Sequence, residues 1–69
     1  MTEGAIPRAV RLIHMIRRLE AGEMLYASDL AEEYGCSQRA IERDIKALAR
    51  APFRLPLERL GWGWRLRQG

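Results

Sequence analysis

The spacing of apolar residues along the chain changes once, near residue 52. Before that point, apolar residues recur every three or four positions, as they do on one face of an α-helix. Beyond it they alternate with polar residues, as they do on one face of a β-strand. Glycine and proline interrupt the pattern at positions 7, 22, 35, 52 and 61. The pattern therefore predicts three helices, over residues 7–21, 27–34 and 38–51, followed by a β-hairpin.

Each predicted helix has one apolar face. The faces consist of Ala9, Leu12, Ile13, Ile16 and Leu19 in the first helix, Leu30, Ala31 and Tyr34 in the second, and Ile41, Ile45 and Leu48 in the third. Gly35 suits the left-handed conformation that often follows a helix. Ser37 suits the N-cap of the third helix, and Pro52 ends it. These residues give each helix a defined side for packing and fix the ends of the last two.

The hairpin is predicted to have one apolar face and one polar face. The apolar face comprises Phe53, Leu55, Leu57, Trp64 and Leu66. Arg65 and Arg67 lie on the opposite face, and Trp62 lies at the turn between Gly61 and Gly63. A chain of 69 residues has room for one domain, so residues 1–69 are predicted to form a single, mainly α domain with a small β-hairpin.

Residues 29–48 have the spacing of a helix-turn-helix. Ala31 is small enough to let the second and third helices cross closely, and Gly35 permits the turn between them. Ile41 then holds the third helix against the first two. In helix-turn-helix proteins the second helix of this motif contacts nucleic acid, so the outer face of the third predicted helix is the candidate binding surface.

Positive charge is concentrated in the second half of the chain. Of the twelve lysines and arginines, eight follow residue 35, together with only three of the nine acids. Four of them lie within about 60° of one another on the third helix, opposite its apolar face, and are called the cationic stripe: Arg39, Arg43, Lys46 and Arg50. Like charges so close together repel, which favours an anionic partner over a merely solvated face. The predicted partner is double-stranded DNA.

Two runs of residues carry a likeness to a known family: Ile41-x-Arg43-Asp44-Ile45-x-x-Leu48 in the third helix and Gly63-Trp64-Arg65-Leu66 in the hairpin. With Arg8-x-x-Arg11-Leu12 and the helix-turn-helix spacing, residues 7–67 resemble the winged helix-turn-helix of DeoR-type and WYL-type bacterial transcription regulators. The resemblance implies sequence-specific binding of duplex DNA for transcription regulation. It implies that the third helix enters the major groove, that Arg43 contacts DNA, and that the hairpin is a wing near the DNA backbone.

The sequence departs from this family at three points. Tyr26 stands where these regulators have a Ser or Thr cap, so the second helix is less well capped or the phenol contacts a phosphate. Cys36 replaces an aliphatic residue and is expected to be a small buried hydrophobe. These regulators continue into an effector-sensing domain, so a chain ending at Gly69 is either part of a longer regulator or a freestanding protein.

The candidate DNA contacts have different expected roles. Gln38, Arg39 and Arg43, early in the third helix, are expected to read base edges, while Tyr26 and Ser37 hold the backbone. The candidate phosphate contacts are Lys46, Arg50, Arg59, Arg65 and Arg67.

Two candidate contacts have alternative interpretations. Glu42 either accepts a hydrogen bond from a cytosine amino group or pairs with Lys46 one turn later. Trp62 either contacts DNA or a partner chain, or packs back on the domain. Asp44, beside the apolar face, is expected to be structural and to pair with Arg8 or Arg11 of the first helix.

Other functions have less support in the sequence. The alternative is a winged-helix protein-interaction module, which would not need the cationic stripe. No spacing sets a nucleophile beside a base, so no enzyme is expected, and His14 has no partner at metal-ligand spacing, so no metal or cofactor is expected. No apolar run approaches the about 18 residues of a membrane span, and a cytoplasmic location is predicted. Val10 is a candidate contact for a homodimer on a palindromic site.

Overall fold

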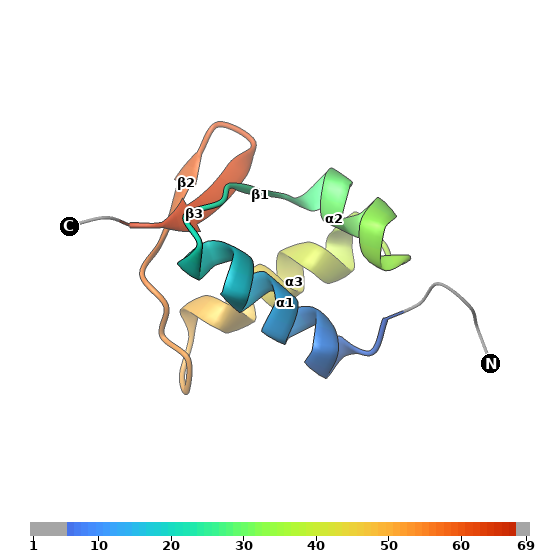
Figure 1. Ribbon diagram of the computed structural model, residues 1–69, viewed down its shortest axis with the longest axis horizontal. Coiled ribbons are helices and arrows are strands. Elements are labelled where there is room, and N and C mark those ends of the chain that lie inside the picture. The colour runs from blue at the N-terminus through green and yellow to red at the C-terminus, as the bar shows by residue number, and fades with distance from the viewer. Residues whose placement is uncertain (1–5, 68–69) are drawn as a thin grey trace.

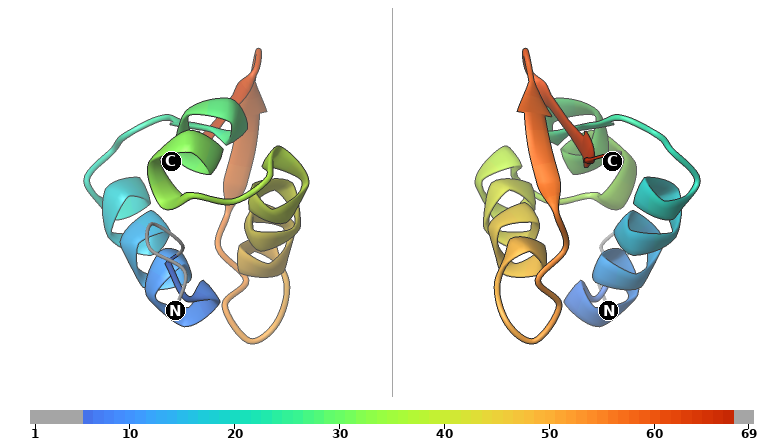
Figure 2. Two further views of the ribbon diagram at one scale, coloured as in Figure 1. Left: turned by 90° about the vertical axis from the view of Figure 1, so that its right-hand side faces the viewer. Right: turned by 90° about the vertical axis from the view of Figure 1, so that its left-hand side faces the viewer.

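The computed structural model describes residues 6–67, which form three helices and a three-stranded antiparallel sheet (Figure 1). The elements in chain order are α1 (Arg8–Glu20), β1 (Leu25–Tyr26), α2 (Ala27–Tyr34), α3 (Gln38–Ala49), β2 (Leu57–Leu60) and β3 (Gly63–Leu66). The strand order in the sheet is β1-β3-β2. The tip of the β2–β3 hairpin projects past the helices, as a wing (Figure 2). The predicted mainly α fold with a hairpin wing is confirmed.

One apolar core lies between the helices and the sheet. Its buried residues are Met15 and Leu19 of α1, Leu25 of β1, Ala27, Leu30, Ala31 and Tyr34 of α2, and Ile41, Ile45 and Leu48 of α3. Every residue predicted for the apolar faces of α2 and α3 is among them. Burial of Ala31 and Ile41 confirms the packing expected from the helix-turn-helix spacing.

The turn between α2 and α3 also forms as predicted. Gly35 ends α2 with a positive φ of 69°, and the Ser37 hydroxyl accepts a hydrogen bond of 3.1 Å from the Ala40 N–H at the start of α3. Tyr26 occupies the N-cap of α2 and makes no side-chain capping hydrogen bond there, as its side-chain type predicts. Cys36, in the turn, is partly buried against the core.

The predicted apolar face of α1 is wrong at two positions. Ala9 and Ile13 are exposed, whereas Met15 is fully buried. The helix is rotated because Arg11 turns toward α3, where it pairs with Asp44, and this brings Met15 rather than Ile13 to the core. The apolar period alone does not distinguish these two orientations, since Ile13 and Met15 are both apolar.

The predicted start of the hairpin is also wrong. β2 begins at Leu57, and residues 51–56 form a loop in which Phe53 is exposed and Arg54 has a positive φ of 50°. A hydrogen bond of 2.9 Å from the Leu55 N–H to the Leu48 carbonyl ties this loop to α3. The loop replaces a strand because its two prolines have no N–H to donate to a strand partner. Pro52 also disfavours the helical conformation for the residue before it, and α3 ends at Ala49 rather than at residue 51.

The two-residue strand β1 was not predicted, because two residues are too few to show alternation. It pairs with the far side of β3, placing Leu25 opposite Trp64 and Tyr26 opposite Gly63. A Cβ atom on Gly63 would lie 2.7 Å from Cγ of Met24 and 2.9 Å from Cε1 of Tyr26. Gly63 therefore accommodates the close approach of the Met24 and Tyr26 side chains, while Gly61, with φ of 60°, forms the turn.

Candidate nucleic-acid interface

The cationic stripe forms the outer ridge of α3. Its four side chains are exposed on the side of the helix opposite the buried Ile41, Ile45 and Leu48. Within residues 6–67, none of the four is in an ion pair. No ion pair of the described residues therefore neutralises this ridge, and Glu42, beside Lys46, is the carboxylate at its edge.

Asp44 fixes the orientation of this ridge from the opposite side of α3. Its side chain is 1% exposed and accepts hydrogen bonds from Nε of Arg8, at 2.9 Å, and Nε of Arg11, at 2.5 Å. The hydrogen bond to Asp44 raises the pKa of the Arg11 guanidinium, outweighing the opposite effect of burial. The predicted pairing of Asp44 with α1 is confirmed, and both arginines take part.

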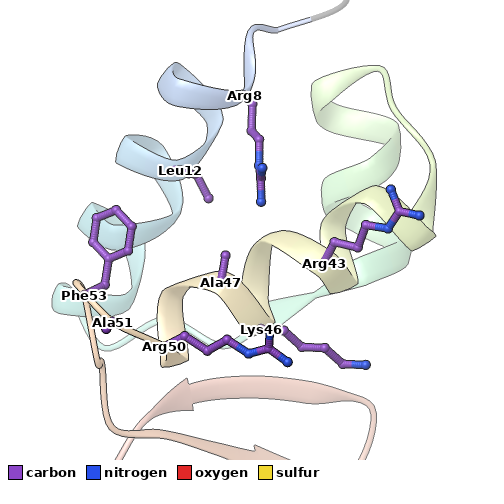
Figure 3. A pocket seen from close by; sticks show the side chains of 8 residues that line it. All are labelled: Arg8, Leu12, Arg43, Lys46, Ala47, Arg50, Ala51 and Phe53. Carbon is purple, nitrogen blue, oxygen red and sulfur yellow. The ribbon is translucent and has the colours of Figure 1, made fainter.

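A hollow of about 520 Å³ separates the ridge from α1 and is called the α1-side hollow (Figure 3). It is lined by Arg8, Leu12, Arg43, Lys46, Ala47, Arg50, Ala51 and Phe53. Leu12 and Ala47 face each other across it, and Arg8 extends into the space between α1 and α3. The hollow thus combines an apolar floor with a rim of four cations. Arg8 was missed as a site residue, although its predicted pairing with Asp44 already placed it beside α3.

A second hollow, of about 230 Å³, lies between the other flank of α3 and the wing, and is called the wing-side hollow. It is lined by Tyr26, Ala27, Ser28, Gln38, Glu42, Arg59, Trp62 and Trp64. The Arg59 guanidinium carbon lies 5.2 Å from the ring centre of Trp64, within the range of a cation–π contact. Trp62 is 82% exposed. Packing back on the domain, one of the alternatives for Trp62, is therefore wrong.

Arg65, in β3, and Arg67, just after it, do not line either hollow. Arg65 pairs across the sheet with Glu58, Nε to Oε2 at 2.9 Å, on the face opposite Trp64. Arg67 follows β3 at the base of the hairpin, where its N–H donates to the Pro56 carbonyl at 2.7 Å. Arg59 lies on the same face of the sheet as Trp64, its cross-strand partner. The wing therefore presents cations on both faces, with only Arg59 beside α3.

Glu42 does not form the predicted pair with Lys46. Within residues 6–67 neither side chain is in an ion pair, and both lie on the rim of a space that they share with Arg59 and Trp64. The Glu42 carboxylate thus faces the wing across the wing-side hollow.

Three helices, a turn at Gly35 between the second and third, a hairpin wing and an exposed cationic face on α3 together define a winged helix-turn-helix domain. A sequence model of the family described as "HTH domain" matches residues 11–60, more than half of the chain. The chain belongs to this family of helix-turn-helix DNA-binding domains. Comparison with curated proteins and with solved structures gives no match. Among the helices of residues 6–67, none is long and apolar enough to cross a membrane.

Proposed function

We propose that this domain binds duplex DNA sequence-specifically and thereby regulates transcription, with α3 in the major groove. The observation that carries the proposal is the unneutralised cationic stripe on the outer ridge of α3. The major groove, about 12 Å wide, admits an α-helix. A protein-interaction module would not need the cationic stripe, whose like charges repel one another.

The hollows on both sides of α3 fit the two strands that border a major groove. With the ridge in the groove, one sugar-phosphate backbone lies over the α1-side hollow and the other over the wing-side hollow. Arg8, Lys46 and Arg50 then meet phosphates on the α1 side, where the hollow has no acidic lining residue. On the other side, Tyr26 and Ser28 at the start of α2 and Arg59 on the wing are placed to hold the second strand.

Base recognition is assigned to the first turns of α3. Gln38, Arg39 and Arg43 lie within the first two turns of the helix, whose N-terminal part faces the base edges in helix-turn-helix proteins. Arginine pairs with guanine through two hydrogen bonds, and glutamine with adenine. The Ser37 hydroxyl accepts the N-cap bond and keeps its own proton to donate to a phosphate.

The finer assignment is to the DeoR-type and WYL-type regulators of the bacterial cytoplasm. It is supported by the Asp44 pairs, since the Arg8-x-x-Arg11 and Arg43-Asp44 runs that resemble this family meet in space. A homodimer on a palindromic site belongs to the same proposal, and Val10 is exposed on α1 as such a contact requires. No catalytic role is proposed.

The test is selection of a binding site from random duplexes, followed by affinity measurements on single variants. Arg39→Ala and Arg43→Ala should each weaken binding to the selected site by about 1–3 kcal/mol and relax the preference at one base pair. Arg17→Ala, which removes one exposed charge from α1, is the matched control and should leave the preference unchanged. If both stripe variants bind the selected site as the wild type does, α3 is not the recognition helix.

A further inference from the structure

The wing-side hollow differs in chemistry from the α1-side hollow. The α1-side hollow carries four cations on its rim, whereas the wing-side hollow carries one arginine, three aromatic rings and the Glu42 carboxylate. A carboxylate repels phosphate, but it accepts hydrogen bonds from the amino groups of bases. The lining around Glu42 therefore suits a base better than a phosphate, while Tyr26, Ser28 and Arg59 remain available to hold the backbone.

Trp62 adds an exposed aromatic surface at the outer edge of the hollow. It is 82% exposed, although a tryptophan side chain gains more than most from being covered. A Cβ atom on the neighbouring Gly61 would meet nothing within 4 Å, so the tip of the wing stands free. A nucleobase is a flat ring, and any of the four bases can stack on such a surface.

The remaining groups of the hollow complete a set that recognises bases. Gln38 offers an amide with both donors and acceptors, and the ring of Trp64 carries the Arg59 guanidinium at 5.2 Å. The volume of about 230 Å³ equals that of several liquid waters, at about 30 Å³ each, which leaves space for a planar ring.

We propose that the wing-side hollow binds a nucleobase that has left the base stack, with Trp62 stacking on the ring and Glu42 accepting a hydrogen bond from its exocyclic amino group. This inference rests on the proposed binding of duplex DNA. It makes the wing a sensor of local opening or distortion of the duplex beside the major-groove site, because an already unpaired base avoids the cost of unstacking. Adenine and cytosine carry the required amino group and thymine does not.

The experiment compares three short fluorescent duplexes that share one arbitrarily chosen sequence. The first is fully paired, the second has one extra unpaired adenine, and the third has one extra unpaired thymine. The wild type should bind the adenine duplex about tenfold more tightly than the paired one, and more tightly than the thymine duplex. Trp62→Ala should bind the paired duplex within about twofold of the wild type but lose the preference for unpaired bases. Trp62→Phe, which keeps a stacking ring, should retain most of it.

Glu42→Ala separates stacking from hydrogen bonding. This variant should still prefer unpaired bases, but it should no longer distinguish adenine from thymine. Circular dichroism of each variant checks folding, which the exposed positions of Trp62 and Glu42 favour.

Equal binding of all three duplexes by the wild type would overturn the inference while leaving duplex binding intact. An equal loss on all three probes in Trp62→Ala would also overturn it, because Trp62 would then be a general contact. A protein that self-associates without DNA, and loses this association in Trp62→Ala, would assign the tip to a partner chain. Failure of the wild type to bind any duplex would instead refute the proposed function itself.

Discussion

The Asp44→Asn substitution tests how the structure positions the recognition helix. Asparagine keeps the shape of aspartate but removes the charge and replaces one acceptor oxygen by an amino group that faces an arginine. Asp44 is 1% exposed, while the side chains of its partners Arg11 and Arg8 are 11% and 58% exposed. The substitution therefore leaves the Arg11 guanidinium shielded from water and without its counter-charge.

The two partners contribute unequally to the cost. The hydrogen bond from the shielded Arg11 is worth about 1.5–3 kcal/mol, as expected for a bond between charged groups, and the exposed Arg8 adds about 0–1 kcal/mol. The sum predicts that Asp44→Asn lowers the free energy of unfolding by about 1.5–4 kcal/mol. For a domain of this size, that loss corresponds to a fall in Tm of about 6–32 °C.

Thermal and urea unfolding followed by circular dichroism measure this cost. Arg11→Ala should be nearly as destabilising as Asp44→Asn, while Arg8→Ala should cost less than about 1 kcal/mol. Glu33→Gln, which removes an exposed pair with Arg18, is the control and should change stability by less than about 0.5 kcal/mol. An Asp44→Asn protein as stable as the wild type, or an Arg8→Ala protein less stable than Arg11→Ala, would refute this account of the Asp44 pairs.

Two further predictions concern the wing. Gly63→Ala should lower the free energy of unfolding by about 1–3 kcal/mol in urea titration, because the added Cβ would displace the side chains of Met24 and Tyr26. Unchanged stability would show that these side chains move aside without cost. The double substitution Arg65→Ala with Arg67→Ala removes the half-exposed pair with Glu58, so it should cost only about 1 kcal/mol in stability. It should nevertheless weaken binding to selected and random DNA by similar factors in anisotropy titrations. Loss of binding to the selected site alone would show that the wing reads bases.

The helix-turn-helix was predictable because several independent local signals coincide within residues 29–48. Gly35, the Ser37 cap and the apolar spacing of α3 all specify the same geometry, and Asp44 breaks an apolar face in a way that demands a partner. The rotation of α1 was not predictable in this way. Both of its possible faces are apolar, and the choice depends on Arg11 meeting Asp44, 33 residues further along the chain.

The two hollows were beyond sequence reasoning for a different reason. The cationic stripe lies on one helix and follows from helical geometry, but each hollow is lined by segments that lie far apart in the sequence, two for the α1-side hollow and three for the wing-side hollow. Arg59 illustrates the difficulty, because alternation from Leu57 gives its face of the strand but not the residue that it meets. That it lies against Trp64 depends on the register of the hairpin.

The salt dependence of duplex binding tests the central claim, that the ridge of α3 with its two hollows is a DNA interface, most directly. The wild-type affinity for a duplex is measured by anisotropy over a range of salt concentrations. If the six cations Arg8, Lys46, Arg50, Arg59, Arg65 and Arg67 each meet a phosphate, the plot of log affinity against log salt should have a slope of about −5.4, and Lys46→Ala should make it shallower by about 0.9. A flat plot, or a slope unaffected by Lys46→Ala, would contradict the account.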